Sequence, residues 1–124
     1  MEDLLAEAKI VRKKAYAPYS NFKVGAAVLT IDGKIFTGCN VENSSYGLSI
    51  CAERSAISNA ISSGYKKFTK IAVVTDSEPP ASPCGACRQV IFEFGDDIEV
   101  IMANLKGDIK VMKISELLKD GFKR

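Results

Sequence analysis

The sequence contains no histidine. Histidine is the side chain most often used as a general base, as a member of a catalytic triad or as a zinc ligand, so its absence excludes all three roles at once. Any acid–base or metal chemistry must therefore rest on cysteine, aspartate, glutamate, lysine or tyrosine.

Long apolar runs are also missing. No stretch approaches the roughly 20 apolar residues that a membrane-spanning helix needs. The first residues, MEDLLAEAKIVRKK, are charged and have the periodicity of an amphipathic helix, which is unlike a secretory signal. We therefore expect a cytoplasmic protein with no membrane partner.

Neither sign of charge dominates. The 124 residues include 17 basic and 15 acidic side chains, for a formal net charge of +2. Arg12-Lys13-Lys14 is the one local basic cluster, and such a run on a helix flank is usually a solvated face. We therefore expect a small-molecule substrate and no nucleic-acid partner.

The length and the 47% hydrophobic content suit one domain, which we place at residues 1–124. Asp32-Gly33 is expected to supply the positive φ angles of a first hairpin, and Ser115 to cap a last helix. Periodicity and turn residues predict, in order, a helix ending before Ala17-Pro18, strands at 24–30 and 34–39, a helix at 51–62, a strand at 70–75, a loop at 78–83, a helix at 84–94, strands at 99–102 and 109–113, and a helix at 115–119. This order predicts an α/β layered fold with a mixed sheet of about five strands.

Three of the four cysteines have a spacing that suits a metal. Cys84 and Cys87 lie three residues apart at a predicted helix start, which puts both side chains on one face of the first turn. Cys51 opens the other central helix, so two positive helix ends can meet over one cation. Three thiolates on Zn²⁺ leave its fourth position for water, as in a catalytic site.

Two neighbours of Cys51 suit such a catalytic site. Glu53 is too close along the chain to ligate comfortably beside Cys51 but is well placed to act as a proton shuttle for water on the metal. Arg54 is expected to donate to the ligand sulfurs and to offset their negative charge.

A closed structural zinc site is the alternative, with Cys39 completing a set of four cysteines. Spacing alone leaves the two interpretations nearly even. Cys39 lies in a predicted strand without a CxxC partner, and a glutamate beside Cys51 has no role in a closed site. These two points favour catalysis.

Longer segments resemble a known family. The zinc deaminases share the pattern of Cys51-Ala52-Glu53 followed by Pro83-Cys84-Gly85-Ala86-Cys87, with cysteine where many members have histidine. The segments AYAPYSNFKVGAAV, GCNVENSSYG, CAERSAI and SPCGACRQV are similar to the small homotetrameric cytidine deaminases. The resemblance implies a three-layer α/β/α fold, one Zn²⁺ per subunit and a homotetramer with active sites near its subunit interfaces.

The same resemblance implies roles for further residues. Asn40 and Glu42 are expected to bind the ribose hydroxyls, and two polar groups spaced two apart at a strand end do face one side. Without the resemblance, that segment reads as a solvated turn. It also implies aromatic contacts to the pyrimidine from Phe22 and from a neighbouring subunit's Phe122, and an interface contact from Tyr46. Without the resemblance, ordinary core packing is the better interpretation of these three rings. The remaining expectations are a backbone contact from Ala52 to the base and support of the zinc site by Gln89.

The expected reaction is hydrolytic deamination of cytidine and deoxycytidine to uridine and deoxyuridine, with release of ammonia and with no organic cofactor. Zinc-bound hydroxide would attack C4 of the cytosine ring while Glu53 moves the protons. The alternatives are a deaminase of another small substrate, such as blasticidin S or a free base, a non-catalytic zinc module, and a domain that edits nucleic acid.

Overall fold

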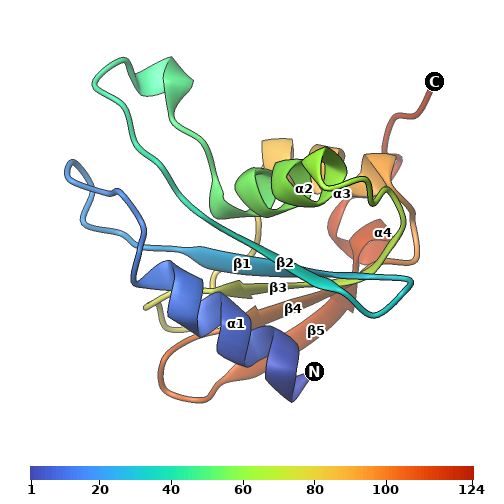
Figure 1. Cartoon of the computed structure of the whole chain (residues 1–124), viewed down its shortest axis with the longest axis horizontal. Helices are drawn as coiled ribbons and strands as arrows, with labels where there is room; N and C mark the ends of the chain where they lie inside the picture. The colour runs from blue at the N-terminus through green and yellow to red at the C-terminus, as the bar shows by residue number, and fades with distance from the viewer.

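The computed structural model describes all 124 residues, Met1–Arg124. Figure 1 shows a central sheet with helices on both sides. In chain order the elements are α1 (Glu2–Arg12), β1 (Gly25–Thr30), β2 (Ile35–Cys39), the 3₁₀ helix η1 (Tyr46–Leu48), α2 (Ala52–Ser62), β3 (Phe68–Val74), α3 (Gly85–Glu93), β4 (Glu99–Ala103), β5 (Ile109–Lys113) and α4 (Ile114–Leu117).

The sheet is mixed and has five strands in the order β2-β1-β3-β4-β5. Strands β3 and β4 pair in parallel, and the other three pairs are antiparallel. The parallel pair is joined through α3, which is the usual connection for parallel neighbours. The predicted mixed sheet is therefore confirmed.

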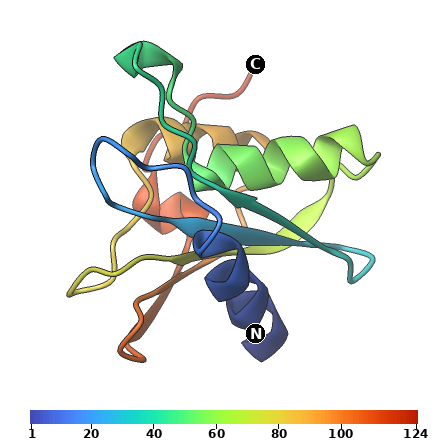
Figure 2. The ribbon, with the colours of Figure 1, turned by 60° about the vertical axis from the view of Figure 1, so that its left-hand side comes forward.

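Alternation along the central strands builds two cores, one on each face of the sheet. In β3, Ile71 and Val73 belong to one buried cluster, whereas Ala72 and Val74 belong to the other. The first cluster packs under α2, α3 and α4, and the second packs under α1. Figures 1 and 2 show α1 alone on one face of the sheet and the other helices on the opposite face. The result is the expected three-layer α/β/α arrangement.

Two glycines let the helices lie close to the sheet. A Cβ added at Gly38 in β2 would lie 2.3 Å from the backbone nitrogen of Ala56 in α2. A Cβ added at Gly25 in β1 would lie 2.1 Å from the carbonyl oxygen of Ala8 in α1. Neither position can hold a larger residue unless a helix moves away.

Two local predictions were wrong. In the first hairpin only Gly33 has a positive φ, of 87°, because the Thr30 carbonyl accepts from the Gly33 N–H to form a tight turn before it. The last helix begins at Ile114, not at Ser115. Its start is held by the Glu116 carboxylate, which accepts the Lys113 N–H at 2.9 Å.

The fold brings the starts of α2 and α3 together at the edge where β3 ends. The two helices pack against each other above the first core cluster. None of the helices is both long and apolar enough to span a bilayer.

Candidate functional site

Three cysteines converge where α2 and α3 begin. Cys51 is the N-cap of α2, Cys84 is the N-cap of α3, and Cys87 lies in the first turn of α3. Their sulfur atoms all lie within 4.8 Å of one another. Tetrahedral Zn²⁺ with Zn–S bonds of about 2.3 Å needs sulfurs roughly 3.8 Å apart, so the cluster has the right size for the ion.

The charges around the cluster also favour a cation. A hydrogen bond from Cys87 is the main cause that lowers the pKa of Cys51 to about 5, and Arg54 adds to this effect. The same hydrogen bond, together with burial, raises the pKa of Cys87. Cys51 thus loses its proton easily, whereas deprotonation of Cys87 as well needs a compensating positive charge. A divalent cation at the centre supplies that charge.

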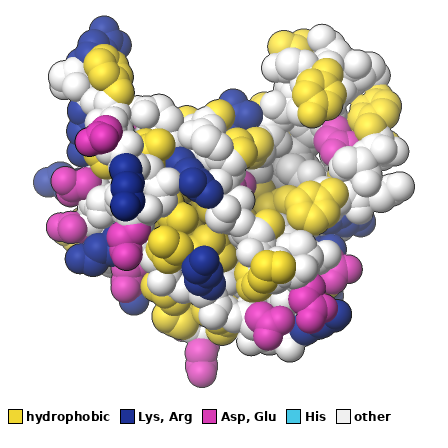
Figure 3. Space-filling model, turned by 180° about the vertical axis from the view of Figure 1, so that it is seen from behind, with side chains coloured by type: hydrophobic (Ala, Val, Ile, Leu, Met, Phe, Trp, Pro, Cys, Tyr) yellow, Lys and Arg dark blue, Asp and Glu magenta, His cyan; other side chains and the backbone are white.

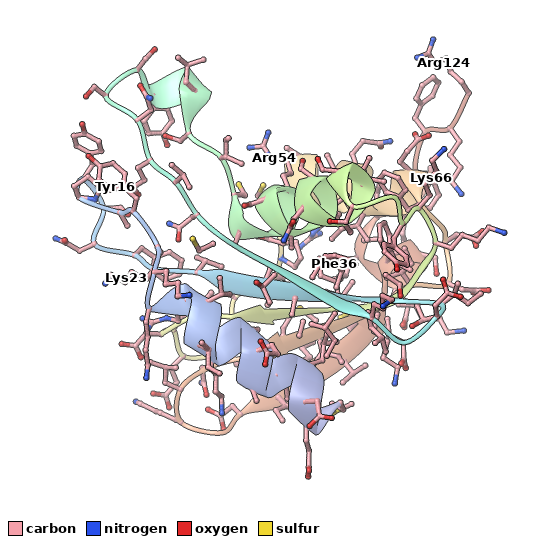
Figure 4. All side chains as sticks on the ribbon, in the orientation of Figure 1. Tyr16, Lys23, Phe36, Arg54, Lys66 and Arg124 are labelled. Atoms are coloured by element: carbon pink, nitrogen blue, oxygen red, sulfur yellow. The ribbon has the colours of Figure 1, made fainter.

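Arg54 makes the contact predicted for it. Its Nη2 donates to the Sγ of Cys51 at 3.6 Å, within the range for a bond to sulfur. Figure 4 shows the labelled Arg54 above the start of α2, beside sulfur atoms. The Nε of Arg54 is buried without a protein partner. The guanidinium therefore places positive charge directly against one ligand sulfur.

Glu53 lies in the first turn of α2, next to the same cysteines. Its side chain is 5% exposed and no ion pair reaches it. Burial is the main cause that raises the pKa of Glu53, and the negative charge of Cys51 raises it further. A carboxyl group with a raised pKa exchanges a proton more readily near neutral pH than an exposed glutamate does.

Cys39 is not part of the cluster. It lies half-buried at the end of β2, and the metal-binding group contains only the other three cysteines. The closed site with four cysteines is therefore wrong for this fold. A metal held by the three thiolates keeps a position open.

A pocket of about 280 Å³ opens beside the cysteines. It brings together residues from five parts of the chain, including the predicted Phe22, Asn40, Glu42, Ala52 and Glu53. Cys51 and Cys84 also line the pocket. The other lining residues were not predicted from the sequence: Val24, Ser49, Ile50, Val73, Thr75, Ala81 and Ser82. Figure 3 shows the molecule from behind, with its upper surface hollowed between two projecting segments.

Asn40 and Glu42 line the pocket and also order the loop before β1. Asn40 accepts the Val24 N–H at 2.8 Å through Oδ1 and donates to the Phe22 carbonyl at 2.8 Å through Nδ2. Glu42 Oε1 accepts the N–H groups of Tyr19 at 2.9 Å and Ser20 at 3.1 Å. Both side chains keep further hydrogen-bonding capacity for a ligand.

Ser20 also fixes the charge of Glu42. Its hydroxyl donates to Oε2, and this bond is the main cause that lowers the pKa of Glu42. The pocket therefore presents a permanent carboxylate at neutral pH, and a carboxylate is a strong acceptor for hydroxyl groups.

Gln89 and Phe122 lie outside the pocket of their own chain. The Gln89 amide donates to the Phe122 carbonyl at 2.8 Å, so it holds the C-terminal segment against α3. The Phe122 side chain is 67% exposed and Tyr46 is 92% exposed. The contact of Gln89 could not be found from sequence, since its partner is 33 residues away.

The sequence and the fold are similar to those of characterised proteins. The family model for the cytidine and deoxycytidylate deaminase zinc-binding region matches residues 1–103. A cytidine deaminase of Sporosarcina psychrophila is 51% identical, with 100% of this chain and 92% of the relative covered. A cytidine deaminase of Halalkalibacterium halodurans is 50% identical, with 96% of this chain and 91% of the relative covered.

Solved structures give the same result. The crystal structure of a cytidine deaminase from Burkholderia pseudomallei superposes with a TM-score of 0.95 at 54% identity, with 98% of both chains covered. A cytidine deaminase from Mycobacterium tuberculosis superposes with a TM-score of 0.86 at 37% identity, over 99% of this chain and 97% of its own. The expected fold class and the resemblance are both confirmed.

Proposed function

Because the chain belongs to the family defined by the cytidine and deoxycytidylate deaminase zinc-binding region, we propose that it hydrolyses the 4-amino group of cytidine and deoxycytidine. The products are uridine or deoxyuridine, and ammonia. One observation carries this proposal: the buried Glu53 carboxyl adjoins a cluster of three cysteines, in the same pocket as the hydrogen-bonding side chains of Asn40 and Glu42.

Cys51, Cys84 and Cys87 hold one Zn²⁺ per chain. When bound, the ion would act as a Lewis acid that lowers the pKa of a water molecule, so that the water gives up a proton and becomes nucleophilic toward the C4 atom of cytosine. Arg54 donates to Cys51 Sγ and withdraws negative charge from that ligand. Because three thiolates reduce the Lewis acidity of zinc, this donation helps to keep the water reactive.

Glu53 moves the protons. It accepts one proton from the attacking water and gives it to N3 of the cytosine ring. It then accepts the second proton from the hydroxyl group now on C4 and gives it to the amine, which leaves as ammonia. It lines the pocket and is only 5% exposed, so its carboxyl group has little contact with bulk water that could exchange its proton.

The remaining pocket residues bind the nucleoside. Asn40 and Glu42 bind the sugar hydroxyls, the Ala52 backbone contacts the amide edge of the base, and Phe22 packs against the pyrimidine ring. The support is that all four line one pocket and that Glu42 is held as a carboxylate. In this role Glu42 distinguishes a nucleoside from a free base.

The Glu42→Ala variant is expected to raise KM for cytidine about 10-fold or more, because hydrogen bonds to a charged acceptor are worth about 1.5–3 kcal/mol. Steady-state kinetics with cytidine checks this result. The matched control is Ser20→Ala, which removes one anchor of the loop but keeps the carboxylate. An equal rise in KM for both variants would mean that Glu42 acts only by ordering the loop.

Assembly is a separate part of the proposal. The exposed rings of Tyr46 and Phe122 lie on projecting segments and are suited to contact neighbouring subunits of a homotetramer. Phe122 then reaches the pyrimidine of a neighbouring site, and Gln89 supports the catalytic centre indirectly by holding that segment. We also place the protein in the cytoplasm, as a single domain spanning residues 1–124.

The proposal is tested by following the ultraviolet absorbance of cytidine after adding protein of known zinc content. Cytosine, blasticidin S and single-stranded oligonucleotides are assayed in parallel. Turnover of the nucleosides alone supports the proposal. Turnover of blasticidin S or cytosine instead would favour another small-substrate deaminase, and turnover of oligonucleotides would favour a nucleic-acid-editing domain.

A further inference from the structure

Arg88 in α3 links three separate segments through one side chain. Its Nε donates to the Pro83 carbonyl at 2.8 Å, and its Nη2 donates to the Ser82 hydroxyl at 2.9 Å. Its Nη1 donates to the Leu117 carbonyl at the end of α4 at 2.8 Å. The guanidinium thus joins α3 to the loop before it and to the C-terminal part of the chain.

The loop that Arg88 holds is one wall of the pocket. Ala81, Ser82 and Cys84 all line the pocket, and Pro83 precedes the metal-ligating Cys84. A change in the position of this wall therefore changes the space available to the base.

This wall has few other means of support. Residues 80 and 83 are prolines, which have no N–H to donate. The backbone N–H groups of Ala81 and Ser82 donate to no protein group. The hydrogen bonds that residues 80–83 accept all come from the Arg88 side chain. Without this side chain, no hydrogen bond would hold residues 80–83. The next residue, Cys84, is held independently, because its carbonyl accepts the Arg88 backbone N–H at 2.9 Å.

The chemistry of arginine suits this task. Arg88 is half-buried and takes part in no ion pair, and its guanidinium instead donates hydrogen bonds to three neutral oxygen atoms. A planar guanidinium presents several N–H groups in a fixed fork, whereas a lysine ammonium is a single flexible donor group. Lysine keeps the charge but cannot make the same three bonds together.

We propose that Arg88 is a positioning residue that fixes the pocket wall of residues 81–83 against the substrate base. This inference rests on the proposed function for its kinetic effect, and on the hydrogen bonds above for its structural effect. Arg88 does not contact the reacting atoms; it acts through Ser82 and Pro83.

The test compares Arg88→Lys, Ser82→Ala and the double variant as zinc-loaded proteins. Arg88→Lys is expected to lower kcat for cytidine about 10- to 100-fold, because small misplacements of groups around a substrate have effects of this size. Zinc content should stay at one per chain. Ser82→Ala alone should have a smaller effect, and it should add nothing to Arg88→Lys, because both changes break the same hydrogen bond.

A second measurement does not depend on turnover. Methyl relaxation of Ala81, measured by NMR, should show a lower order parameter in Arg88→Lys than in the unchanged protein. Asn59→Ala is the matched control, since the Asn59 Nδ2 also donates to a backbone carbonyl, that of Thr37 at 3.1 Å, and neither residue lines the pocket. It should leave both kcat and the order of Ala81 unchanged.

The outcomes are distinct. If Arg88→Lys lowers only the melting temperature, with kcat and Ala81 order unchanged, the inference is overturned. Additive losses in the double variant would also overturn it. If the unchanged protein fails to deaminate cytidine, the proposed function falls, and the Ala81 methyl still decides whether Arg88 fixes the wall.

Discussion

The Glu53→Gln variant is expected to bind zinc normally and to lose at least about 10²- to 10⁴-fold in kcat for cytidine, the range typical of general acid–base catalysis. Glutamine has almost the same shape but cannot carry a proton from water to the ring nitrogen and the leaving amine. The zinc ligands are untouched, because the three sulfurs come from Cys51, Cys84 and Cys87. Steady-state kinetics together with metal analysis measures both quantities.

Burial makes this variant a clean test. Glu53 is 5% exposed and has a raised pKa, so the folded protein disfavours its charged form. Replacing it with a neutral side chain should not unfold the protein, which circular dichroism can verify. The matched control is Glu93→Gln, the same change at an exposed position near the end of α3. Near-normal turnover by Glu53→Gln would exclude the proton-transfer role.

The Cys84→Ala variant is expected to lose zinc, activity and much of its thermal stability together. Cys84 joins α3 to the metal and through it to α2, and the binding energy of a thiolate zinc site is partly folding energy. Metal analysis, calorimetry and the cytidine assay on the same preparation measure the three losses.

Cys39→Ala provides the comparison for this prediction. Cys39 is a half-buried cysteine outside the cluster, so its loss should leave zinc content and turnover unchanged. A Cys84→Ala protein that is free of zinc yet as stable as the unchanged chain would show that the metal does not hold the two helices together.

Local sequence patterns predicted the sheet and the cysteine cluster well. The continuous apolar runs in β3 and β4 and the glycine of the first hairpin are short-range signals, and they identified the strands. The cluster was predictable because Cys51 and Cys84 stand at helix starts, and packing of α2 on α3 then brings those starts together.

Long-range side-chain contacts could not be predicted in the same way. Glu42 bonds the loop residues Tyr19 and Ser20, and Arg88 bonds Leu117 29 residues away. No periodicity marks such pairs, because they depend on how the loops pack in three dimensions. The start of α4 was wrong for a different, local reason. The Glu116 carboxylate accepts the Lys113 N–H three residues before it, so the helix begins at Ile114 and Ser115 is not its cap.

The central claim is that this chain uses one cysteine-bound zinc to hydrolyse a cytosine nucleoside. The most direct measurement quantifies uridine and ammonia from cytidine with the zinc-loaded protein, after chelation, and after zinc is restored. We expect equal amounts of the two products, loss of activity on chelation and recovery with one zinc per chain. A protein that holds one zinc per chain and releases no ammonia from cytidine or deoxycytidine would contradict the claim.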